Sequence, residues 1–221
     1  VHLQDWPKAE KDLINEKLSQ ELLQFVAIAT VCDMIPLIDL GRVFLRVGLK
    51  HLQTSKNPGI NALMEECGVV LSDIGAFEIG FILGPRLNAI GRLEHAIDGL
   101  RLLCTKDPIK AKKLAKLLCE MNVKRKDLTE IAIEEARLKI GEGNKKIYIL
   151  DSTTWQSGII GLIAAKICET YLRPSIAISV GELVSKGSAR SRDGINIIEV
   201  IRECSDLLID VGGHKGAAGF S

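Results

Sequence analysis

One uninterrupted run of helical periodicity, from Pro108 to about Ile140, constrains the fold of this 221-residue chain more than any other segment. Proline suits the first turn of a helix, where its missing N–H would have no helical partner. Apolar residues then recur at helical spacing until two glycines end the pattern: Leu114, Leu118, Met121, Leu128, Ala132 and Leu138, then Gly141 and Gly143. At about 1.5 Å per residue, this segment predicts a helix roughly 50 Å long. Its first half is rich in lysine, which is typical of a solvated helix face.

The residues on either side of this helix follow two different patterns. Before it, helical periodicity covers residues 9–32, 41–52, 60–67 and 73–83, and residues 86–92 are predicted to form a loop opening into a helix that ends near Cys104. After it, strands are predicted over 146–150, 175–180 and 184–191, helices over 158–171 and 195–208, and more sheet from Gly212 onward. We therefore expect an α/β protein with a helical part, a long helix and a sheet flanked by helices.

Composition narrows the class of protein. The hydrophobic content of 47% is enough for a sizeable core, and the six cysteines include no Cys-x-x-Cys pair, which favours reduced, packed thiols in a cytoplasmic protein over a zinc site. No apolar run approaches the roughly 18 residues that span a bilayer. A net charge of +1 excludes a uniformly basic surface but not a local basic face. With only 4% aromatic residues, any contact with nucleic acid would depend on charge and backbone amides more than on stacking.

The most informative motif lies near the end of the sequence and reads Gly212-Gly213-His214-Lys215-Gly216-Ala217-Ala218-Gly219-Phe220. Paired glycines permit positive φ angles and a close approach of the backbone to a ligand. We expect a tight turn at Gly212 and Gly213, with His214 standing on it as a hydrogen-bond donor. The small residues that follow leave room for a flat or anionic group. A Gly-Gly-His sequence alone is equally consistent with an ordinary turn that carries a surface histidine and has no ligand.

Ser188, Arg190 and Arg192 alternate along a predicted strand, so their side chains are expected to share one face. A hydroxyl and two guanidinium groups on one face make a suitable cradle for a phosphate. The alternative is that these are ordinary polar residues of an exposed edge strand.

Two further candidates lie in the helical part. Asp33 follows a long apolar stretch and precedes Pro36; its carboxylate suits Mn²⁺ or Mg²⁺, although an aspartate before a proline is also a common helix-end residue. Arg86, Asn88 and Arg92 carry groups that bind phosphate. The alternative for the arginines is a bond to a backbone carbonyl or to a neighbouring carboxylate.

Four segments occur in the order seen in RecJ-type single-strand exonucleases of the DHH phosphoesterase superfamily. Residues 26–37 resemble the last motif of the DHH catalytic domain, residues 84–92 the RecJ segment after it, residues 186–191 a DHHA1 strand facing nucleic acid, and residues 212–220 the DHHA1 signature. The resemblance implies three parts: 1–105 as the end of a DHH domain, 106–143 as a connecting helix, and 144–221 as a DHHA1 nucleic-acid-binding domain. It also implies that the chain is an internal piece of a longer protein and stops before the DHHA1 domain ends.

The resemblance further implies a 5′–3′ exonuclease for single-stranded DNA that uses a two-metal centre of Mn²⁺ or Mg²⁺ in DNA repair and recombination. Asp33 would be the catalytic metal ligand. The residues implied in binding phosphate or nucleic acid are Arg86, Asn88, Arg92, Ser188, Arg190, Arg192, Gly212, Gly213 and His214. Because no Asp-His-His sequence occurs here, the other metal ligands are expected elsewhere, and the chain alone is expected to be inactive.

Two alternatives remain open at this point. One is a DHH phosphodiesterase acting on short oligoribonucleotides or cyclic dinucleotides, and the other is an inactive RecJ-like scaffold of replication. Single-stranded DNA is the expected partner, with a single-strand-binding protein or a helicase as possible protein partners and no membrane. One position departs from the family pattern: Gln156 stands where the family commonly has the histidine of a Trp-His-x-Gly sequence, so a role that requires protonation there is in doubt.

Overall fold

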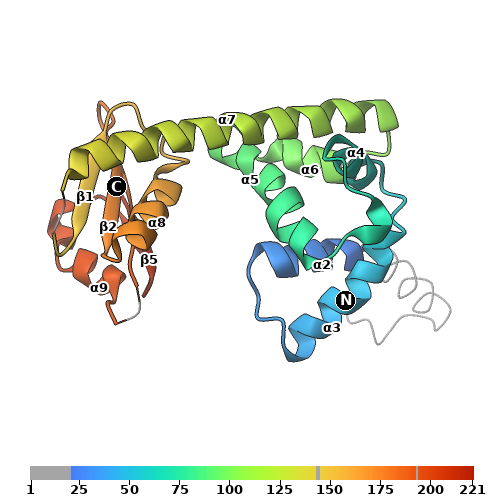
Figure 1. Ribbon diagram of the computed structural model, residues 1–221, viewed down its shortest axis with the longest axis horizontal. Helices are drawn as coiled ribbons and strands as arrows, with labels where there is room; N and C mark the ends of the chain where they lie inside the picture. The colour runs from blue at the N-terminus through green and yellow to red at the C-terminus, as the bar shows by residue number, and fades with distance from the viewer. Residues whose placement is uncertain (1–20, 143–144, 193) are drawn as a thin grey trace. The chain divides into compact units, whose positions relative to one another are not determined.

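The computed structural model describes residues 21–142, 145–192 and 194–221 (Figure 1). The chain divides into two compact units, and the division falls inside the long helix α7 (Pro108–Ile140), between Asn122 and Val123. The bounds of α7 are those predicted from its periodicity. The helix predicted over residues 9–32 is described from residue 21 onward, and its earlier part lies outside the described residues.

The first unit is helical, as predicted (Figure 1). Its elements before α7 are α2 (Leu23–Cys32), α3 (Asp39–Gln53), α4 (Pro58–Glu66), the 3₁₀ turn η2 (Leu71–Asp73), the π-helix η3 (Glu78–Leu83), α5 (Gly84–Leu93) and α6 (Ile97–Cys104). The packing of α2 on α3 requires a glycine at position 48, because a Cβ there would come within 2.2 Å of the Leu23 carbonyl oxygen. Leu52 and Leu118 are completely buried in the resulting core.

The loop predicted over residues 86–92 is wrong, because α5 covers this segment and follows directly from η3. Pro85, which would interrupt the interior of a helix, lies in the first turn of α5, where a proline needs no N–H. Gly84 is held close to α2: a Cβ on it would lie 2.8 Å from the Cys32 sulfur. The segment is therefore a packed helix, and the side chains of Arg86, Asn88 and Arg92 take their directions from that helix.

The second unit is a five-stranded sheet with helices on both faces, which confirms the predicted α/β part (Figure 1). The strands are β1 (Tyr148–Ser152), β2 (Ser175–Ser179), β3 (Lys186–Arg190), β4 (Val211–His214) and β5 (Ala217–Phe220). Their order in the sheet is β1-β2-β3-β5-β4. β1 and β2 are parallel, and the other three pairs of neighbours are antiparallel. α8 (Ile160–Tyr171) packs on β2 and β3, where the Ser175 hydroxyl donates to the Ala164 carbonyl. α9 (Ile197–Arg202) packs on the opposite face, against Ala189 and Ala218. The helix predicted over 195–208 thus ends early, and a 3₁₀ turn, Ser205–Leu207, follows it.

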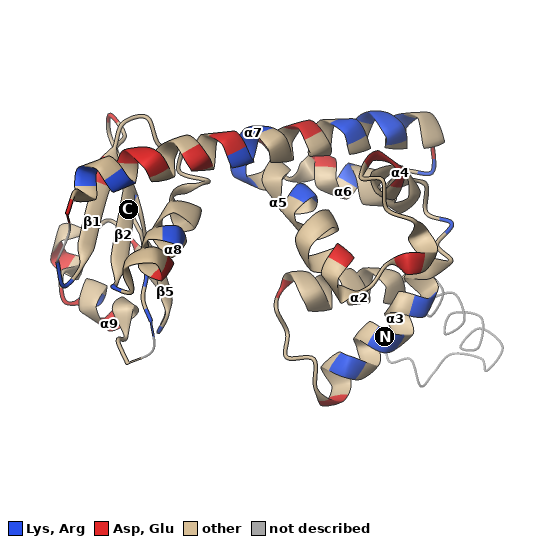
Figure 2. Cartoon of the chain, in the orientation of Figure 1, with Lys and Arg blue, Asp and Glu red and all other residues tan. Residues whose placement is uncertain are grey.

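Charge is distributed unevenly along α7. Figure 2 shows that the charged residues in its first half are mostly basic, whereas its second half mixes acidic residues with Lys and Arg. The basic half is solvated, as predicted: Lys112 pairs with Glu65 at 3.0 Å, and both side chains are about two-thirds exposed. Across residues 21–142, 145–192 and 194–221, no helix has the length and apolar character needed to cross a membrane.

Glu135 fixes the end of α7 to the segment that follows β1. Its carboxylate accepts hydrogen bonds from Trp155 Nε1 at 2.9 Å and Thr154 Oγ1 at 3.2 Å, and it pairs with Lys139 at 2.9 Å. Trp155 is 3% exposed, and the Lys139 ammonium also lies 5.3 Å from the centre of the Trp155 ring. The bond from Lys139, supported by those from Ser152 and Trp155, lowers the pKa of the Glu135 carboxyl against the opposing effect of burial.

These bonds make the stability of the second unit dependent on pH. Because the pKa of Glu135 is lower in the folded chain than its usual value of about 4.3, the carboxylate stabilises the fold above that pH, and its contribution disappears as the pH falls through the folded pKa. We expect Glu135→Gln to lower the free energy of unfolding by about 1 kcal/mol at pH 7 and by much less at pH 3. Urea titrations followed by Trp155 fluorescence measure this difference. The control is Glu134→Gln, whose exposed ion pair with Arg137 should matter little; an equal loss at both pH values for Glu135→Gln would contradict the argument.

Candidate nucleic-acid interface

The pairing of three strands builds an open floor on one face of the sheet. Two rows of paired residues cross β3, β5 and β4 there: Ser188–Gly219–Gly212 and Arg190–Ala217–His214. Apart from the end residues Ser188, Arg190 and His214, no side chain in these rows is larger than a methyl group. A Cβ placed on Gly212 would meet no atom within 4 Å, so the space above the strand is open. A phosphate can therefore approach the main chain between a guanidinium on one side and an imidazole on the other.

The tight turn predicted at Gly212 and Gly213 is wrong, because both residues belong to β4 and the chain turns at Lys215–Gly216. The physical need for glycine is nevertheless present at position 213. Gly213 has a φ of 153°, and a Cβ there would lie 2.4 Å from the Ala217 carbonyl oxygen and 2.5 Å from the Ala218 Cα. His214 is the exposed last residue of β4, so its imidazole extends from a strand end and not from a turn.

Arg190 and Ser188 act as one unit on β3. Arg190 Nη1 donates to Ser188 Oγ at 3.0 Å and to the Ala189 carbonyl at 2.8 Å. Both side chains lie beneath the first turn of α8, where a Cβ on Gly161 would be 3.1 Å from Arg190 Nη2 and 3.3 Å from Ser188 Oγ. The missing side chain at position 161 thus brings the guanidinium next to the amino-terminal end of a helix, which also attracts anions.

Arg192 does not take part in the alternation, because β3 ends at Arg190. It lies beside Arg190 in a pocket of about 400 Å³ that is also lined by Ala165, Cys168, Glu169 and Ser191. Burial raises the pKa of the Cys168 thiol, and the charges of Arg192 and Arg190 partly oppose this shift. The thiol stays protonated, so the charged groups of this pocket are the two arginines and the Glu169 carboxylate. Gln156, where a histidine was expected, is exposed just before α8, and its carbonyl accepts the Ile159 N–H at 3.0 Å.

Asp33 ends α2 in a well-defined cap. The Met34 N–H donates to the Val31 carbonyl at 3.1 Å and the Ile35 N–H to the Thr30 carbonyl at 3.0 Å, with Met34 in the left-handed region at a φ of 55°. The Asp33 side chain is exposed, so a fixed backbone presents its carboxylate to solvent. Within the described ranges, no group of three or more His, Cys, Asp or Glu side chains is placed to hold a metal ion. Asp33 can thus supply one ligand, but the described residues do not complete a metal centre.

The three candidates on α5 do not share one face: Asn88 and Arg92, four residues apart, lie on one side of the helix, and Arg86 lies on another. Arg86 Nη1 donates to the Ile82 carbonyl at 2.7 Å, which is the alternative left open for it, and its guanidinium also hydrogen-bonds Cys119 of α7. Asn88 and Arg92 are exposed. The contact with Cys119 could not be seen in the sequence, because nothing in the neighbourhood of that cysteine distinguishes it from a packing residue. A role for these three residues in binding phosphate stays a prediction.

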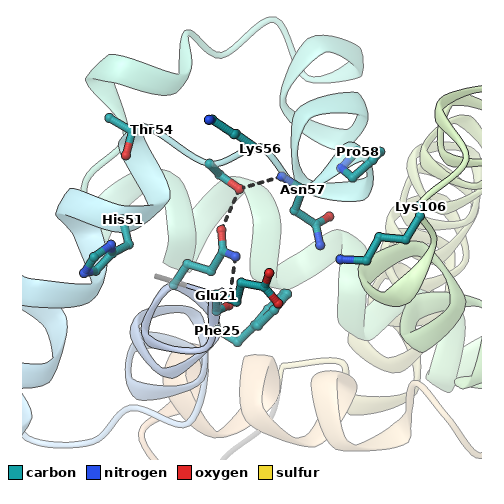
Figure 3. Close-up of a pocket in the computed structure, with 10 residues that line it drawn as sticks. Glu21, Phe25, His51, Thr54, Lys56, Asn57, Pro58 and Lys106 are labelled. Carbon is teal, nitrogen blue, oxygen red and sulfur yellow. Dashed lines mark hydrogen bonds between the residues drawn. The ribbon is translucent and has the colours of Figure 1, made fainter. Parts of the chain in front are cut away.

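A separate pocket of about 670 Å³ lies in the first unit between the end of α3 and the start of α4 (Figure 3). Ser55 Oγ donates to Gln24 Oε1 at 2.5 Å and accepts the Asn57 N–H at 3.1 Å, so the polar groups at its base bond to one another. Lys56 and Lys106 lie at its margin. None of the predicted site residues is among those that line it.

Comparison with known proteins connects this geometry to a family. Residues 144–221 match the DHHA1 domain. The single-stranded-DNA-specific exonuclease RecJ of Bacillus subtilis is 32% identical over 93% of this chain, and that of Escherichia coli is 33% identical over 91%. The crystal structure of RecJ from Thermus thermophilus in complex with Mg²⁺ matches 90% of the chain with a TM-score of 0.82 at 33% identity, and a structure of exonuclease RecJ bound to manganese does so with a TM-score of 0.77 at 32% identity.

The chain spans only part of these proteins. It covers 27% of the Bacillus subtilis protein and 37% of the Escherichia coli protein. It covers 32% of the Thermus thermophilus structure and 51% of the manganese-bound one.

The position of Gly161 generates a prediction about stability. Replacing a helical glycine by alanine usually stabilises a protein by about 0.5–1 kcal/mol. We expect Gly161→Ala to lack this gain, because the new methyl group must displace Arg190 or Ser188. In an Arg190→Ala background the contact with the guanidinium is gone and only Ser188 Oγ lies near the new Cβ, at 3.3 Å, so the same substitution should then be stabilising. Urea denaturation of the four proteins in this double-mutant cycle gives the coupling; a similar gain in both backgrounds would show that Gly161 does not control the arginine.

Proposed function

Because the chain matches RecJ exonucleases over about nine-tenths of its length and ends in a segment that matches the DHHA1 domain, we propose that it is part of an exonuclease that degrades single-stranded DNA from the 5′ end. The observation that carries the proposal is the open floor of β3, β5 and β4. Its glycines and alanine leave the main chain accessible between Arg190 and His214. We further propose a cytoplasmic role in DNA repair and recombination.

The chemistry of the floor favours the backbone of a nucleic acid over its bases. A guanidinium, a hydroxyl, an imidazole and glycine amides all bond to phosphate oxygens, while the floor offers no Phe, Tyr or Trp ring for a base to stack on. Such contacts are independent of base sequence, as an exonuclease that degrades strands of any sequence requires. Arg86, Asn88 and Arg92 of α5 are proposed as additional contacts to the strand, with Arg86 the first candidate for its 5′ end.

A divalent metal would supply the hydrolytic chemistry. The matching RecJ crystal structures are complexes with Mg²⁺ or Mn²⁺. When bound, a pair of such ions polarises a phosphodiester and lowers the pKa of water enough to yield hydroxide near neutral pH. The exposed carboxylate of Asp33, on a backbone fixed by the cap of α2, is an oxygen ligand of the kind these ions prefer. We propose that Asp33 contributes one ligand and that the others belong to parts of the protein beyond the described residues.

Salt dependence tests the proposed interface. Each neutralised phosphate releases condensed counterion, so binding of a fluorescent single strand should weaken as salt rises, with a slope of about −0.7 per contact in a double-logarithmic plot. Arg190→Ala should weaken binding of all sequences alike and reduce the slope by up to about one. Fluorescence anisotropy between 50 and 200 mM NaCl, roughly the range over which such effects are large, measures both quantities. Arg202→Ala on α9, which packs on the opposite face of the sheet, makes the same change in charge and should leave the slope unaltered.

An Arg190→Ala variant with the affinity and slope of the unmodified chain would show that strands bind elsewhere. An oligoribonucleotide of the same length, run in parallel, distinguishes a DNA interface from that of a phosphodiesterase of short RNA. Preferential binding of the oligoribonucleotide would favour that alternative.

Asp33 can be tested in the exonuclease of which we propose this chain to be a part. Asp33→Ala should abolish metal-dependent release of nucleotides from labelled single-stranded DNA while leaving affinity for DNA within a few-fold, since a metal ligand is lost and a strand contact is not. Asp73→Ala, which removes another carboxylate of the first unit, should retain turnover. The 221-residue chain with Mn²⁺ should release no nucleotides. Turnover by the Asp33→Ala protein would leave this residue with its capping role only.

A further inference from the structure

Two cysteine thiols meet an arginine at the edge of the first unit's core. Cys67 follows the last residue of α4, Cys119 lies on α7, and Arg86 lies on α5. The Cys67 thiol is hydrogen-bonded to the Cys119 sulfur, and the Arg86 guanidinium is hydrogen-bonded to the same sulfur. Both cysteines are only partly buried, so a small solute can reach the pair.

The packing of α4 on α7 holds the two sulfurs together. On α7, Ala111, Ala115 and Leu118 are completely buried, so the face that carries Cys119 is directed at the core. Glu65 of α4, two residues before Cys67, accepts a hydrogen bond from Lys112 of α7 at 3.0 Å. The thiols therefore face each other because of helix packing, and no covalent link is needed to keep them adjacent.

The surroundings of the pair favour a thiolate on one sulfur only. The hydrogen bond from Cys67 and the bond and charge of Arg86 lower the pKa of Cys119 to about 6, against burial and the repulsion of Glu66. The same bond to Cys119, with burial, raises the pKa of Cys67 well above its usual range. At neutral pH the arrangement is a thiolate beside a thiol. By contrast, burial raises the pKa of both Cys32 and Cys168, which keeps those thiols protonated.

We propose that Cys67 and Cys119 are a peroxide-sensitive dithiol whose oxidation to a disulfide removes the anionic partner of Arg86. In the first step the Cys119 thiolate attacks hydrogen peroxide: an S–O bond forms, the O–O bond breaks, and the departing hydroxide takes up a proton to become water. In the second step the Cys67 sulfur attacks the sulfenic sulfur: the S–S bond forms, the S–O bond breaks, and the proton of Cys67 leaves with the hydroxide as a second water. Two thiols are oxidised and one peroxide is reduced.

The reaction changes the hydrogen-bond partners of Arg86. In the reduced chain its guanidinium is divided between the Ile82 carbonyl and the Cys119 sulfur, while its buried Nε has no hydrogen-bond partner. A disulfide sulfur bears no charge, so oxidation leaves the guanidinium with one neutral acceptor. A positive group in that position binds an incoming anion more readily. If Arg86 contacts the strand, as proposed above, the oxidised protein should bind single-stranded DNA more tightly than the reduced protein.

Mass spectrometry tests the dithiol without reference to DNA. After treatment with stoichiometric hydrogen peroxide at pH 7 and blocking of the remaining thiols, the expected product is a Cys67–Cys119 disulfide that dithiothreitol reverses. Cys67→Ser should stop the reaction at a Cys119 sulfenic acid that dimedone traps, while the matched change Cys204→Ser should leave the disulfide yield unaltered. Arg86→Gln should slow oxidation of Cys119 at pH 7 several-fold and less at pH 9, because it removes the charge that favours the thiolate. Oxidation of Cys119 no faster than that of the exposed Cys104 and Cys204, or a rate indifferent to Arg86→Gln, would overturn the proposal.

The effect on Arg86 needs a second measurement. Anisotropy titrations of the reduced and the oxidised chain with the same 5′-phosphorylated strand should differ by a few-fold, and the difference should vanish in Cys67→Ser. A disulfide that forms without changing affinity would refute the release of Arg86 while leaving the binding floor of the sheet intact. Absence of DNA binding in both forms would instead contradict the proposed function, so the two failures can be told apart.

Discussion

The carboxylate of Glu135 is the interaction on which the second unit depends. It joins α7 to the segment that contains Trp155, and the carbonyl of Trp155 in turn accepts the Ser179 hydroxyl at the end of β2. This segment leads directly into α8, whose first turn covers Arg190 through Gly161. The contact between Glu135 and the buried indole of Trp155 thus begins the series of contacts that positions the Arg190 guanidinium. The strand pairing of the sheet does not involve these contacts, whereas α8 begins shortly after the segment that they hold.

Elements with a strong local signal were predictable from the sequence. The bounds of α7 follow from one proline, one apolar period and two closing glycines, all of which act within a few residues of the backbone they control. The strands around Ile149 and Ile176 were recognisable for the same reason. The wrong prediction of a loop over residues 86–92 has a different origin. Pro85 is a breaker in most contexts, but here it occupies the first turn of α5, which follows directly from the π-helix η3.

The candidate site shows the same division between local and non-local information. The residue types in the Gly-Gly-His segment indicated a close approach to an anion, but their placement in a strand depends on pairing with Ala217 and Ala218, which no local rule reveals. The meeting of Arg86 with Cys119 depends on the packing of α5 and α7. The kind of ligand that a segment binds was therefore predictable from its residue types. The contacts between residues far apart in the sequence were not predictable, because they depend on how the strands pair and the helices pack.

The floor formed by Gly212, Gly219 and Ala217 has a consequence for the kinds of DNA such a protein could process. The side chains of these residues cannot hydrogen-bond to a base edge, and they are too small to form a pocket that selects a base by its size. A strand held there by its phosphates would turn its bases toward solvent. Oxidised, alkylated or missing bases would then pass over the sheet as readily as intact ones, so damage would hinder digestion only where it alters the sugar–phosphate backbone itself.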